Sequence, residues 1–196
     1  MDTLISTNLP KRLNLGCGSY KKPGFLNVDN EPSAEPDLLL DLEQIPYPFP
    51  DNHFEEIRAY HVLEHLSNPF AVMREIHRIL APNGLVIVRV PHFSRGFTHA
   101  GHKRGFDVTF SFYFSDKFPK SYVIVPFKLE YMRLRWFAQP YLKREVLSTP
   151  VFYTATILGK IIDFFANLSP FITSRLWCYW VGGFEEIEFR FRKITQ

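Results

Sequence analysis

One helix followed at once by an apolar strand limits the folds open to this chain. Residues 68–80, NPFAVMREIHRIL, repeat apolar side chains at helical spacing, with Asn68 as a candidate N-cap and Pro69 in the first turn. A PNG turn ends the helix, and residues 85–91, LVIVRVP, follow as a largely apolar run rich in β-branched side chains. Such a run is typical of a strand at the buried centre of a parallel sheet. The pair therefore predicts an α/β fold.

Short strands are also expected before this helix, separated by turns. They lie at residues 12–16 (RLNLG), 25–29 (FLNVD), 36–42 (PDLLLDL) and 54–63 (FEEIRAYHVL). About ten residues join the first two strands and about seven join the next two, whereas a parallel crossover that includes a helix needs about a dozen or more. We therefore expect the helices on this flank to be reduced to single turns or lost.

Four segments are expected after the first helix and its strand. Residues 92–127 are rich in His, Phe and basic side chains without a clear period, which predicts loops and short helices over one edge of the sheet. A strand is expected at residues 127–137. Residues 155–168 have the amphipathic pattern of a helix, which is expected to pack onto the sheet; the alternative is a helix that lies on a membrane surface. In residues 185–194 apolar and charged side chains alternate, which is typical of a half-buried strand.

The last two expected strands indicate how the sheet ends. The acids of residues 185–194 would face Arg133 and Arg135 if the two strands pair in antiparallel fashion. The overall prediction is an α/β, Rossmann-like fold. It has a mostly parallel sheet with a C-terminal antiparallel strand pair, and reduced helices beside the first three strands.

Composition narrows the classes of partner. The chain has 196 residues, of which 46% are hydrophobic and 22% charged, so a single folded domain is expected. The formal charge is +3 and the basic residues are scattered, which does not indicate nucleic-acid binding. Only Cys17 and Cys178 are present, without a CxxC pair, so we expect no disulfide framework and a reducing, cytoplasmic location. We expect neither a signal peptide nor an integral membrane segment, because the apolar runs are too short.

A glycine loop follows the first expected strand. Gly16 and Gly18 allow the backbone to turn sharply and approach a ligand, and Asp29 ends the second strand. Ligands of open α/β sheets bind beyond the carboxyl ends of the strands, so these residues would meet at one edge. A carboxylate there can accept both hydroxyl hydrogens of a ribose. The alternative is a plain tight turn followed by a solvated aspartate.

The loop departs from the dinucleotide fingerprint G-x-G-x-x-G. Lys21 occupies the position of its third glycine. Pro23 and Gly24 stand where a helix N-terminus would bind a pyrophosphate. These departures disfavour an NAD-dependent dehydrogenase and favour a nucleoside without phosphates.

Further motifs follow in order: LNLGCG with GFLNVD, then DLEQIPYPFPDNHF, YHVLEHL and RILAPNGLVIVRVP. Together they resemble the class I S-adenosylmethionine (SAM)-dependent methyltransferases, and most closely a subgroup of small methyltransferases with these motifs. The resemblance spans roughly residues 12–110, with a weaker match in the last strand. It implies SAM as the cofactor and S-adenosylhomocysteine as the product.

The resemblance also implies which residues contact SAM. The loop from Gly16 to Gly18 would wrap the methionyl part, and Asp29 would hold the ribose hydroxyls. Asp41 would receive the adenine amino group, with Leu42 against the ring. The full set of implied cofactor-binding residues is Asn14, Leu15, Gly16, Cys17, Gly18, Asp29, Asn30, Asp41, Leu42, Tyr60 and His61.

One of these residues departs from the class, and two others lie near the reacting sulfonium. Asn14 stands where an acid is common in the class, so backbone carbonyls would have to replace a charged contact to the ammonium group of SAM. Tyr60 and His61 lie just after the fourth strand in the chain and would lie beside the sulfonium.

Histidines supply the candidates for catalysis. A histidine near the cofactor could take a proton from an acceptor hydroxyl as the methyl group moves, because its ordinary pKa is about 6.5. His102 and Arg104 lie in HKRGF, the part of residues 92–110 most similar to the subgroup, and are candidates for the base and an anion clamp. His61 is the third candidate. The alternative is that His102 orders its loop and Arg104 is solvated.

The remaining histidines and the aromatic residues have structural interpretations as well. His65, in the YHVLEHL motif, is expected to pack or cap at the strand-to-helix corner. His92, His99 and His102 could ligate a metal, but they lack the tight spacing of a zinc site, so no metal is expected. The aromatic residues 110–118 would form either a lid over the site or ordinary core.

The predicted function is SAM-dependent methyl transfer to a small-molecule acceptor, at oxygen because histidines surround the expected site. The alternatives are a protein that holds SAM or its product without turnover, and a peripheral membrane protein whose contacts come from residues 120–180. One domain, residues 1–196, would comprise a cofactor-binding half at about 12–91, acceptor and lid segments at about 92–180, and the last strand at 184–194.

Overall fold

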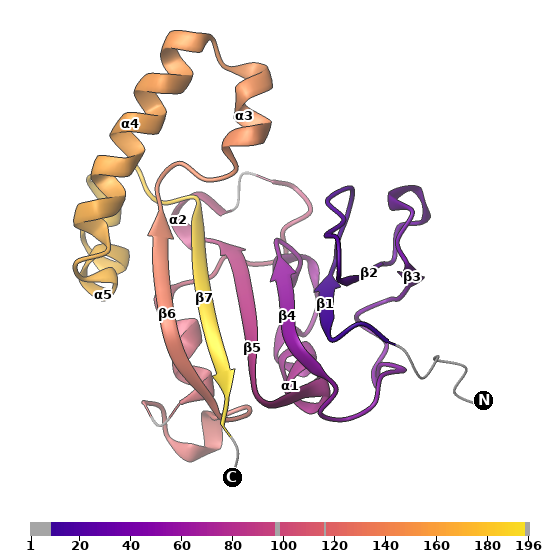
Figure 1. Cartoon of the computed structure of the whole chain (residues 1–196). Helices are drawn as coiled ribbons and strands as arrows, with labels where there is room; N and C mark the ends of the chain where they lie inside the picture. Colours follow the sequence, from indigo (N-terminus) through magenta and orange to yellow (C-terminus); the bar gives the residue numbers. More distant parts are fainter. Residues whose placement is uncertain (1–8, 97–98, 116, 195–196) are drawn as a thin grey trace.

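A sheet with the strand order β3-β2-β1-β4-β5-β7-β6 forms the centre of the computed structural model, which describes residues 9–96, 99–115 and 117–194. Strand β7 is antiparallel to both β5 and β6, and the other pairs are parallel. The predicted Rossmann-like α/β fold with a C-terminal antiparallel strand pair is confirmed (Figure 1). The strands are β1 Arg12–Leu15, β2 Leu26–Asp29, β3 Leu38–Leu39, β4 Phe54–Tyr60, β5 Leu80–Pro91, β6 Phe127–Arg135 and β7 Glu186–Lys193.

Helices and 3-10 turns connect the strands. The N-cap predicted for α1 is confirmed, because the Asn68 side chain accepts a hydrogen bond from the N–H of Ala71 at 3.1 Å. The α-helices are α1 Pro69–Ile79, α2 Phe93–Gly96, α3 Pro140–Val146, α4 Thr149–Ala166 and α5 Pro170–Arg175. The 3-10 turns are η1 Pro32–Ala34, η2 Leu63–His65, η3 Val108–Phe114, η4 Lys120–Tyr122 and η5 Trp177–Tyr179.

The flank beside β1, β2 and β3 carries turns in place of full helices, as predicted. In residues 16–25, all of which the structure describes, no helix follows β1. Between β2 and β3 the chain forms only the turn η1. Strand β3 is shorter than the strand predicted at residues 36–42, because it pairs with β2 only over Leu38 and Leu39. The carboxyl ends of β1 and β2 are therefore reached without an intervening helix.

Phe110 and Phe114 of η3 pack on the sheet, which makes these two side chains core and not a lid, whereas Phe112 and Tyr113 stay partly exposed. The ring centroid of Phe110 lies 5.7 Å from that of Phe189, and the ring centroid of Phe114 lies 5.3 Å from that of Phe191. All four side chains are buried, and burial of one phenylalanine stabilises a fold by roughly 1.5–3 kcal/mol. The segment expected over one edge of the sheet thus also covers a face of β7.

The first half of strand β7 is buried on both faces, whereas Arg190, Arg192 and Lys193 are partly exposed, so the prediction of a half-buried strand holds only for its second half. Glu186 and Glu188 are 2% and 0% exposed. The Arg135 side chain lies 3.0 Å from the Glu186 carboxylate and 3.3 Å from that of Glu188, as the predicted pairing requires. Arg133 stands opposite Glu188 in the register, but the ion pairs of Glu188 run to Arg89, Arg135 and Arg190. Arginine side chains thus cover the face that the alternating pattern assigned to water.

Helix α4 turns its polar face toward the protein, whereas the pattern predicted that its apolar face would pack. The Asp163 carboxylate accepts a hydrogen bond from the N–H of Trp136 at 2.7 Å. The Asn167 side chain accepts one from the N–H of Leu134 at 2.8 Å and donates one to the Leu134 carbonyl at 3.0 Å. These bonds attach the helix at the end of β6, where α3 and α4 project from the sheet (Figure 1).

The outward face of α4 continues over α5 and η5. We call these side chains the outer apolar face. In the part of the chain that the structure describes, no helix is both long and apolar enough to cross a membrane. The exposed apolar residues of the face are Ile157, Leu158, Ile161, Phe164, Phe165, Leu168, Ile172, Leu176, Tyr179 and Trp180.

Candidate functional site

The glycine loop after β1 is a tight turn with one open position. Gly16 and Gly18 have φ angles of 62° and 46°, in the left-handed region that favours glycine. A Cβ on Gly16 would lie 2.5 Å from Cγ2 of Val62, so the loop passes directly against the segment after β4. A Cβ on Gly18 would meet nothing within 4 Å. Packing therefore fixes the loop at Gly16 and leaves it open at Gly18.

Asp29 ties the end of β2 to this loop. Its Oδ2 accepts a hydrogen bond from the N–H of Gly18 at 2.7 Å, and its Oδ1 accepts one from the N–H of Glu31 at 3.0 Å. The side chain is half-buried. Each carboxylate oxygen keeps a second lone pair, so Asp29 can still accept two hydroxyl hydrogens. The structure thus brings Gly16, Gly18 and Asp29 together at one edge of the sheet.

Asn14, Leu15 and Cys17 lie beneath the loop. Asn14 is 3% exposed, and its amide donates to Oδ1 of Asn27 at 3.0 Å and to the carbonyl of Tyr20 at 3.3 Å. Leu15 is fully buried. The Cys17 thiol is buried too, and that burial raises its pKa. These side chains face inward and hold the loop in shape.

The residues implied around adenine follow β2 and β3. Asn30 is exposed directly after β2. Strand β3 ends at Leu39, so Asp41 and Leu42 lie in the following turn and not at the end of a strand. The Asp41 carboxylate accepts a hydrogen bond from the N–H of Glu43 at 2.9 Å and stays partly accessible. Leu42 is 5% exposed and belongs to the core.

Tyr60 ends β4, and two cations contact its ring. The Nζ of Lys22 lies 5.2 Å from the ring centroid, and the guanidinium carbon of Arg89 lies 4.4 Å from it. Burial lowers the pKa of Lys22, and the charges of Arg58 and Arg89 lower it further. Lys22 is therefore a cation held over the end of β4. The sequence motifs did not identify it as a site residue.

His61, the next residue, is paired with two carboxylates. Its Nε2 donates to Oε2 of Glu186 at 2.8 Å, and its Nδ1 lies 3.4 Å from Oε1 of Glu64. Burial alone would lower the pKa of His61, but the bond to Glu186 and the carboxylate of Glu64 outweigh burial and raise the pKa to about 9. The ring is thus an imidazolium at neutral pH and does not accept a further proton.

Three further histidines gather above Glu64. The ring centroids of His65 and His102 are 4.9 Å apart, those of His99 and His102 are 4.8 Å apart, and those of His65 and His99 are 5.8 Å apart. The Nε2 of His102 lies 3.9 Å from Oε1 of Glu64. Glu64 is fully buried. Sequence reasoning missed Glu64, although it stands in the YHVLEHL motif.

Arg104 is held against the chain that follows η2. Its guanidinium donates a hydrogen bond to the carbonyl of Ser67 at 2.7 Å, and the Nζ of Lys103 donates to the Ser67 hydroxyl at 2.8 Å. The Nε of Arg104 is buried without a hydrogen-bond partner.

His92 lies apart from the other histidines. It is fully buried, with hydrogen bonds to the hydroxyls of Ser94 at 2.6 Å and Ser174 at 2.8 Å. Burial lowers its pKa to about 4, the charge of Arg175 adds to this effect, and Asp107 opposes it. His92 is thus a neutral structural residue that joins the end of β5 to α5. Of the spaced histidines 92, 99 and 102, only the last two come together.

Comparisons with known proteins identify the fold. Residues 22–88 match a family model described as a methyltransferase domain. A search of curated proteins finds no matching sequence. The N-methyltransferase NodS from Bradyrhizobium japonicum WM9, solved with S-adenosyl-L-homocysteine, is 12% identical with a TM-score of 0.54, over 94% of this chain and 78% of that chain.

Two other solved structures extend the comparison. A SAM-dependent methyltransferase from Archaeoglobus fulgidus is 12% identical with a TM-score of 0.54, over 93% of this chain and 85% of that chain. The cyclase SpnF is 14% identical with a TM-score of 0.56, over 94% of this chain and 75% of that chain. The chain therefore has the fold of the class I SAM-dependent methyltransferases, and SpnF shows that this fold also carries another reaction.

Proposed function

We propose that this protein binds SAM at the open ends of β1, β2 and β3 and transfers its methyl group to a small-molecule acceptor. The observation that carries the proposal is the 2.7 Å hydrogen bond from the Gly18 N–H to Asp29. This bond fixes a carboxylate beside a left-handed glycine turn at the carboxyl ends of parallel strands, where α/β sheets bind nucleosides. The domain match over residues 22–88 and the S-adenosylhomocysteine held by NodS support the same assignment.

SAM would lie along this edge with its parts over different strands. The backbone of residues 16–18 would hold the methionyl part, and Asp29 the ribose hydroxyls. Asp41 would receive the adenine amino group, with Asn30 nearby and Leu42 forming the floor. Asn14, Leu15 and Cys17 would act by supporting the loop, and Tyr60 would border the sulfonium. A sulfonium nucleoside has no phosphate, so it does not need the helix N-terminus that is missing after β1.

The chemistry requires an acceptor oxygen in line with the carbon–sulfur bond. The oxygen lone pair forms a bond to the methyl carbon as the carbon–sulfur bond breaks, S-adenosylhomocysteine leaves, and the hydroxyl proton passes to a base. Holding the two reactants in line supplies most of the acceleration. His102 is the proposed base, since His61 already carries a proton at neutral pH. His61 would orient the acceptor as a donor, and Arg104 would hold an anionic group.

Calorimetric titration with SAM tests the cofactor assignment. We expect wild-type binding, and roughly 10- to 100-fold weaker binding by Asp29→Ala, because hydrogen bonds to a charged group contribute about 1.5–3 kcal/mol. Glu55→Ala, which removes an exposed carboxylate at the other end of β4, is the matched control and should bind like the wild type. Absence of wild-type binding, or equal binding by all three proteins, would contradict the proposal.

Turnover needs a separate experiment. Incubation with SAM labelled on the methyl group and a metabolite extract should transfer label to a small molecule, and the linkage of the product should be an O-methyl group. Binding of SAM with no transfer under any condition would instead favour the alternative of a protein that holds the cofactor without turnover. An N-methyl or C-methyl product would overturn the proposed oxygen acceptor.

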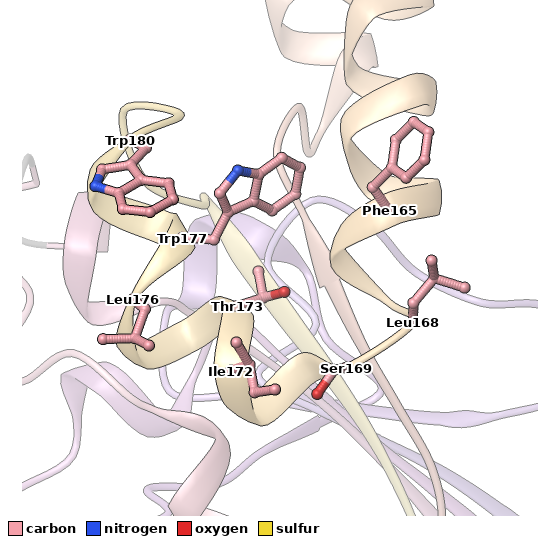
Figure 2. Close-up of a pocket in the computed structure, with 8 residues that line it drawn as sticks. All are labelled: Phe165, Leu168, Ser169, Ile172, Thr173, Leu176, Trp177 and Trp180. Atoms are coloured by element: carbon pink, nitrogen blue, oxygen red, sulfur yellow. The ribbon is translucent and has the colours of Figure 1, made fainter.

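A second candidate function, attachment to a membrane surface, is favoured by the outer apolar face. A hollow of about 450 Å³ lies in this face between α4, α5 and η5. Figure 2 shows Trp177 and Trp180 on one side of it and Phe165 and Leu168 on the other. Trp180 is 82% exposed and Leu168 is 70% exposed. Aromatic and aliphatic side chains exposed together in this way are typical of helices that lie in a lipid interface.

Charge favours anionic lipids as the occupant. In residues 147–181 the only acidic residue is Asp163, which is buried against the N–H of Trp136. The exposed charge of α4 is Lys160, and Arg175 at the end of α5 pairs with the Asp107 carboxylate at 3.2 Å. Beside the outer apolar face Lys160 is thus an exposed cation, and residues 147–181 offer no accessible carboxylate, which suits an anionic bilayer surface.

Vesicle sedimentation tests this candidate. The wild type should sediment with vesicles of phosphatidylcholine and phosphatidylglycerol at low salt. Ile161→Ser/Phe164→Ser should bind at least about tenfold more weakly, since each inserted side chain contributes roughly 1.5–3 kcal/mol. Ile194→Ser, an exposed residue just after β7, should behave like the wild type. Wild-type protein that stays in the supernatant would remove this candidate without affecting the cofactor assignment.

A further inference from the structure

A buried carboxylate without hydrogen bonds lies among imidazoles at the acceptor side of the site. Glu64 is 0% exposed, and neither of its carboxylate oxygens has a hydrogen-bond partner. One potential ligand atom each from Glu64, His65 and His102 lie within 4.8 Å of one another. The His61 imidazolium lies 3.4 Å from Oε1 and offsets part of the charge, but a fully buried carboxylate without hydrogen bonds is still costly, so a ligand that fills its oxygens is to be expected.

Backbone bonds hold these side chains in place. Glu64 and His65 are neighbours in the turn η2, and the N–H of Lys103 donates to the Glu64 carbonyl at 2.9 Å. This bond fastens the segment that carries His102 over η2. The cluster is therefore built from two segments whose relative position the backbone sets, and it does not depend on long, flexible side chains.

The hydrogen bonds of the rings orient their nitrogen atoms. The Nδ1 of His65 lies 3.1 Å from the carbonyl of Gly101, which can only accept, so Nδ1 carries the hydrogen. The lone pair of the neutral ring then sits on Nε2, and this is the arrangement by which backbone carbonyls orient metal-binding histidines. His99 differs, because its Nδ1 accepts a hydrogen bond from the N–H of Gly101 at 3.1 Å. His99 thus stacks on His102 as a neighbour of the cluster.

The donor set selects a class of ion. Two imidazole nitrogens and one carboxylate suit divalent transition metals such as Zn²⁺, whereas Mg²⁺ and Ca²⁺ prefer ligand sets made of oxygen. Three protein ligands also leave at least one coordination position for water or another oxygen ligand. His61 does not need Glu64 as its only counter-ion, because Glu186 already accepts a hydrogen bond from it at 2.8 Å.

We propose that Glu64, His65 and His102 bind one divalent transition-metal ion, with Zn²⁺ as the reference ion. The site lies beside the acceptor side of the proposed active site, but metal binding does not require SAM, so this inference stands or falls separately from the proposed cofactor binding. In the metal-bound protein His102 is a ligand, and an acceptor hydroxyl bound at the open position would lose its proton more readily. The roles of base and ligand for His102 exclude each other.

The test titrates metal into the full chain, without a polyhistidine tag and after removal of metals by a chelator. Co²⁺ serves as the probe because its visible absorption reports nitrogen and oxygen ligands directly, and Zn²⁺ should then displace it. We expect one Co²⁺ per chain and a rise in melting temperature with Zn²⁺. Mg²⁺ at the same concentration should change neither signal.

Variants assign the ligands. His65→Ala and His102→Ala should each weaken Co²⁺ binding by at least about tenfold, since loss even of an orienting partner costs about 10- to 100-fold. Glu64→Gln keeps the shape of the buried side chain and should also weaken binding. His53→Ala, at the opposite end of β4, is the control and should bind like the wild type. The proposal is overturned if the wild type binds no stoichiometric Co²⁺, if the cluster variants bind like the control, or if Mg²⁺ competes.

Discussion

The two sides of the candidate site are built by different means. On the side of β1 and β2, Gly18 and Asp29 lie 11 residues apart, and their bond runs from backbone to carboxylate. On the side of β4 and β5, His61 pairs with Glu186 through side chains that lie 125 residues apart. The first side thus depends on local backbone geometry, and the second on charges that the C-terminal strand supplies. Changes in β7 should therefore affect the histidine side and leave the glycine loop intact.

Removal of the distant charge should have the largest effect. Glu186→Gln leaves the His61 imidazolium and the Arg135 guanidinium without their shared carboxylate, and breaking a buried ion pair costs about 3 kcal/mol. Urea unfolding at pH 7 measures the change in the free energy of unfolding. Glu130→Gln breaks the exposed pair with Arg192 and should cost less than about 1 kcal/mol. Equal decreases in the free energy of unfolding of the two variants would show that the buried ion pair stabilises the protein no more than the exposed one.

A substitution in the glycine loop should have the next largest effect. Gly16→Ala combines a left-handed φ of 62° with a Cβ 2.5 Å from Val62, and we expect a loss of about 2 kcal/mol. Gly18→Ala has the same backbone strain but open space, so it should cost about 1 kcal/mol. Urea unfolding of both variants separates strain from packing. If Gly18→Ala were the more damaging, the loop would not be anchored at Gly16.

The buried neutral histidine should give the smallest effect at neutral pH and a growing one in acid. The folded pKa of His92 is about 4 and the unfolded value is about 6.5, so between these values the unfolded chain binds more protons. Stability should therefore fall as the pH falls from about 6.5 to 4, by about 1 kcal/mol per pH unit from this group. His92→Gln removes the titration, so its unfolding free energy should depend less on pH in this window. Parallel pH profiles of variant and wild type would refute the assignment.

The sequence predicted the features that depend on local geometry, as on the glycine side of the site, better than those that depend on distant segments, as on the histidine side. The bond between Gly18 and Asp29 joins neighbouring strands across a short loop, so the spacing of glycines and acid was enough to place both residues at one edge. The N-cap Asn68 and the strand after α1 were also predictable, because each depends on residues close together in the sequence. The reduced helices beside β1, β2 and β3 were predicted from the short connections between these strands alone.

The rest depended on contacts between distant segments. Glu186 belongs to an alternating pattern that resembles a half-exposed strand, but it is buried where Arg135 of β6 and His61 after β4 pair with its carboxylate. The pattern of α4 defines two faces, but it does not say which one the protein covers. Asp163 and Asn167 determine this by hydrogen bonds to Trp136 and Leu134 at the end of β6. His102 meets Glu64 because the N–H of Lys103 docks on η2, which no spacing rule encodes.

Chemical-shift changes on addition of S-adenosylhomocysteine test the central claim most directly, that the cofactor lies on the glycine side. In ¹H–¹⁵N spectra of the wild type, the amides of Gly16, Gly18 and Asp29 should shift in proportion to occupancy, and those of Lys103 and Arg104 should move less. The same titration of Asp29→Ala should give weaker saturation. Shifts confined to residues 99–104, or none at all, would contradict the account.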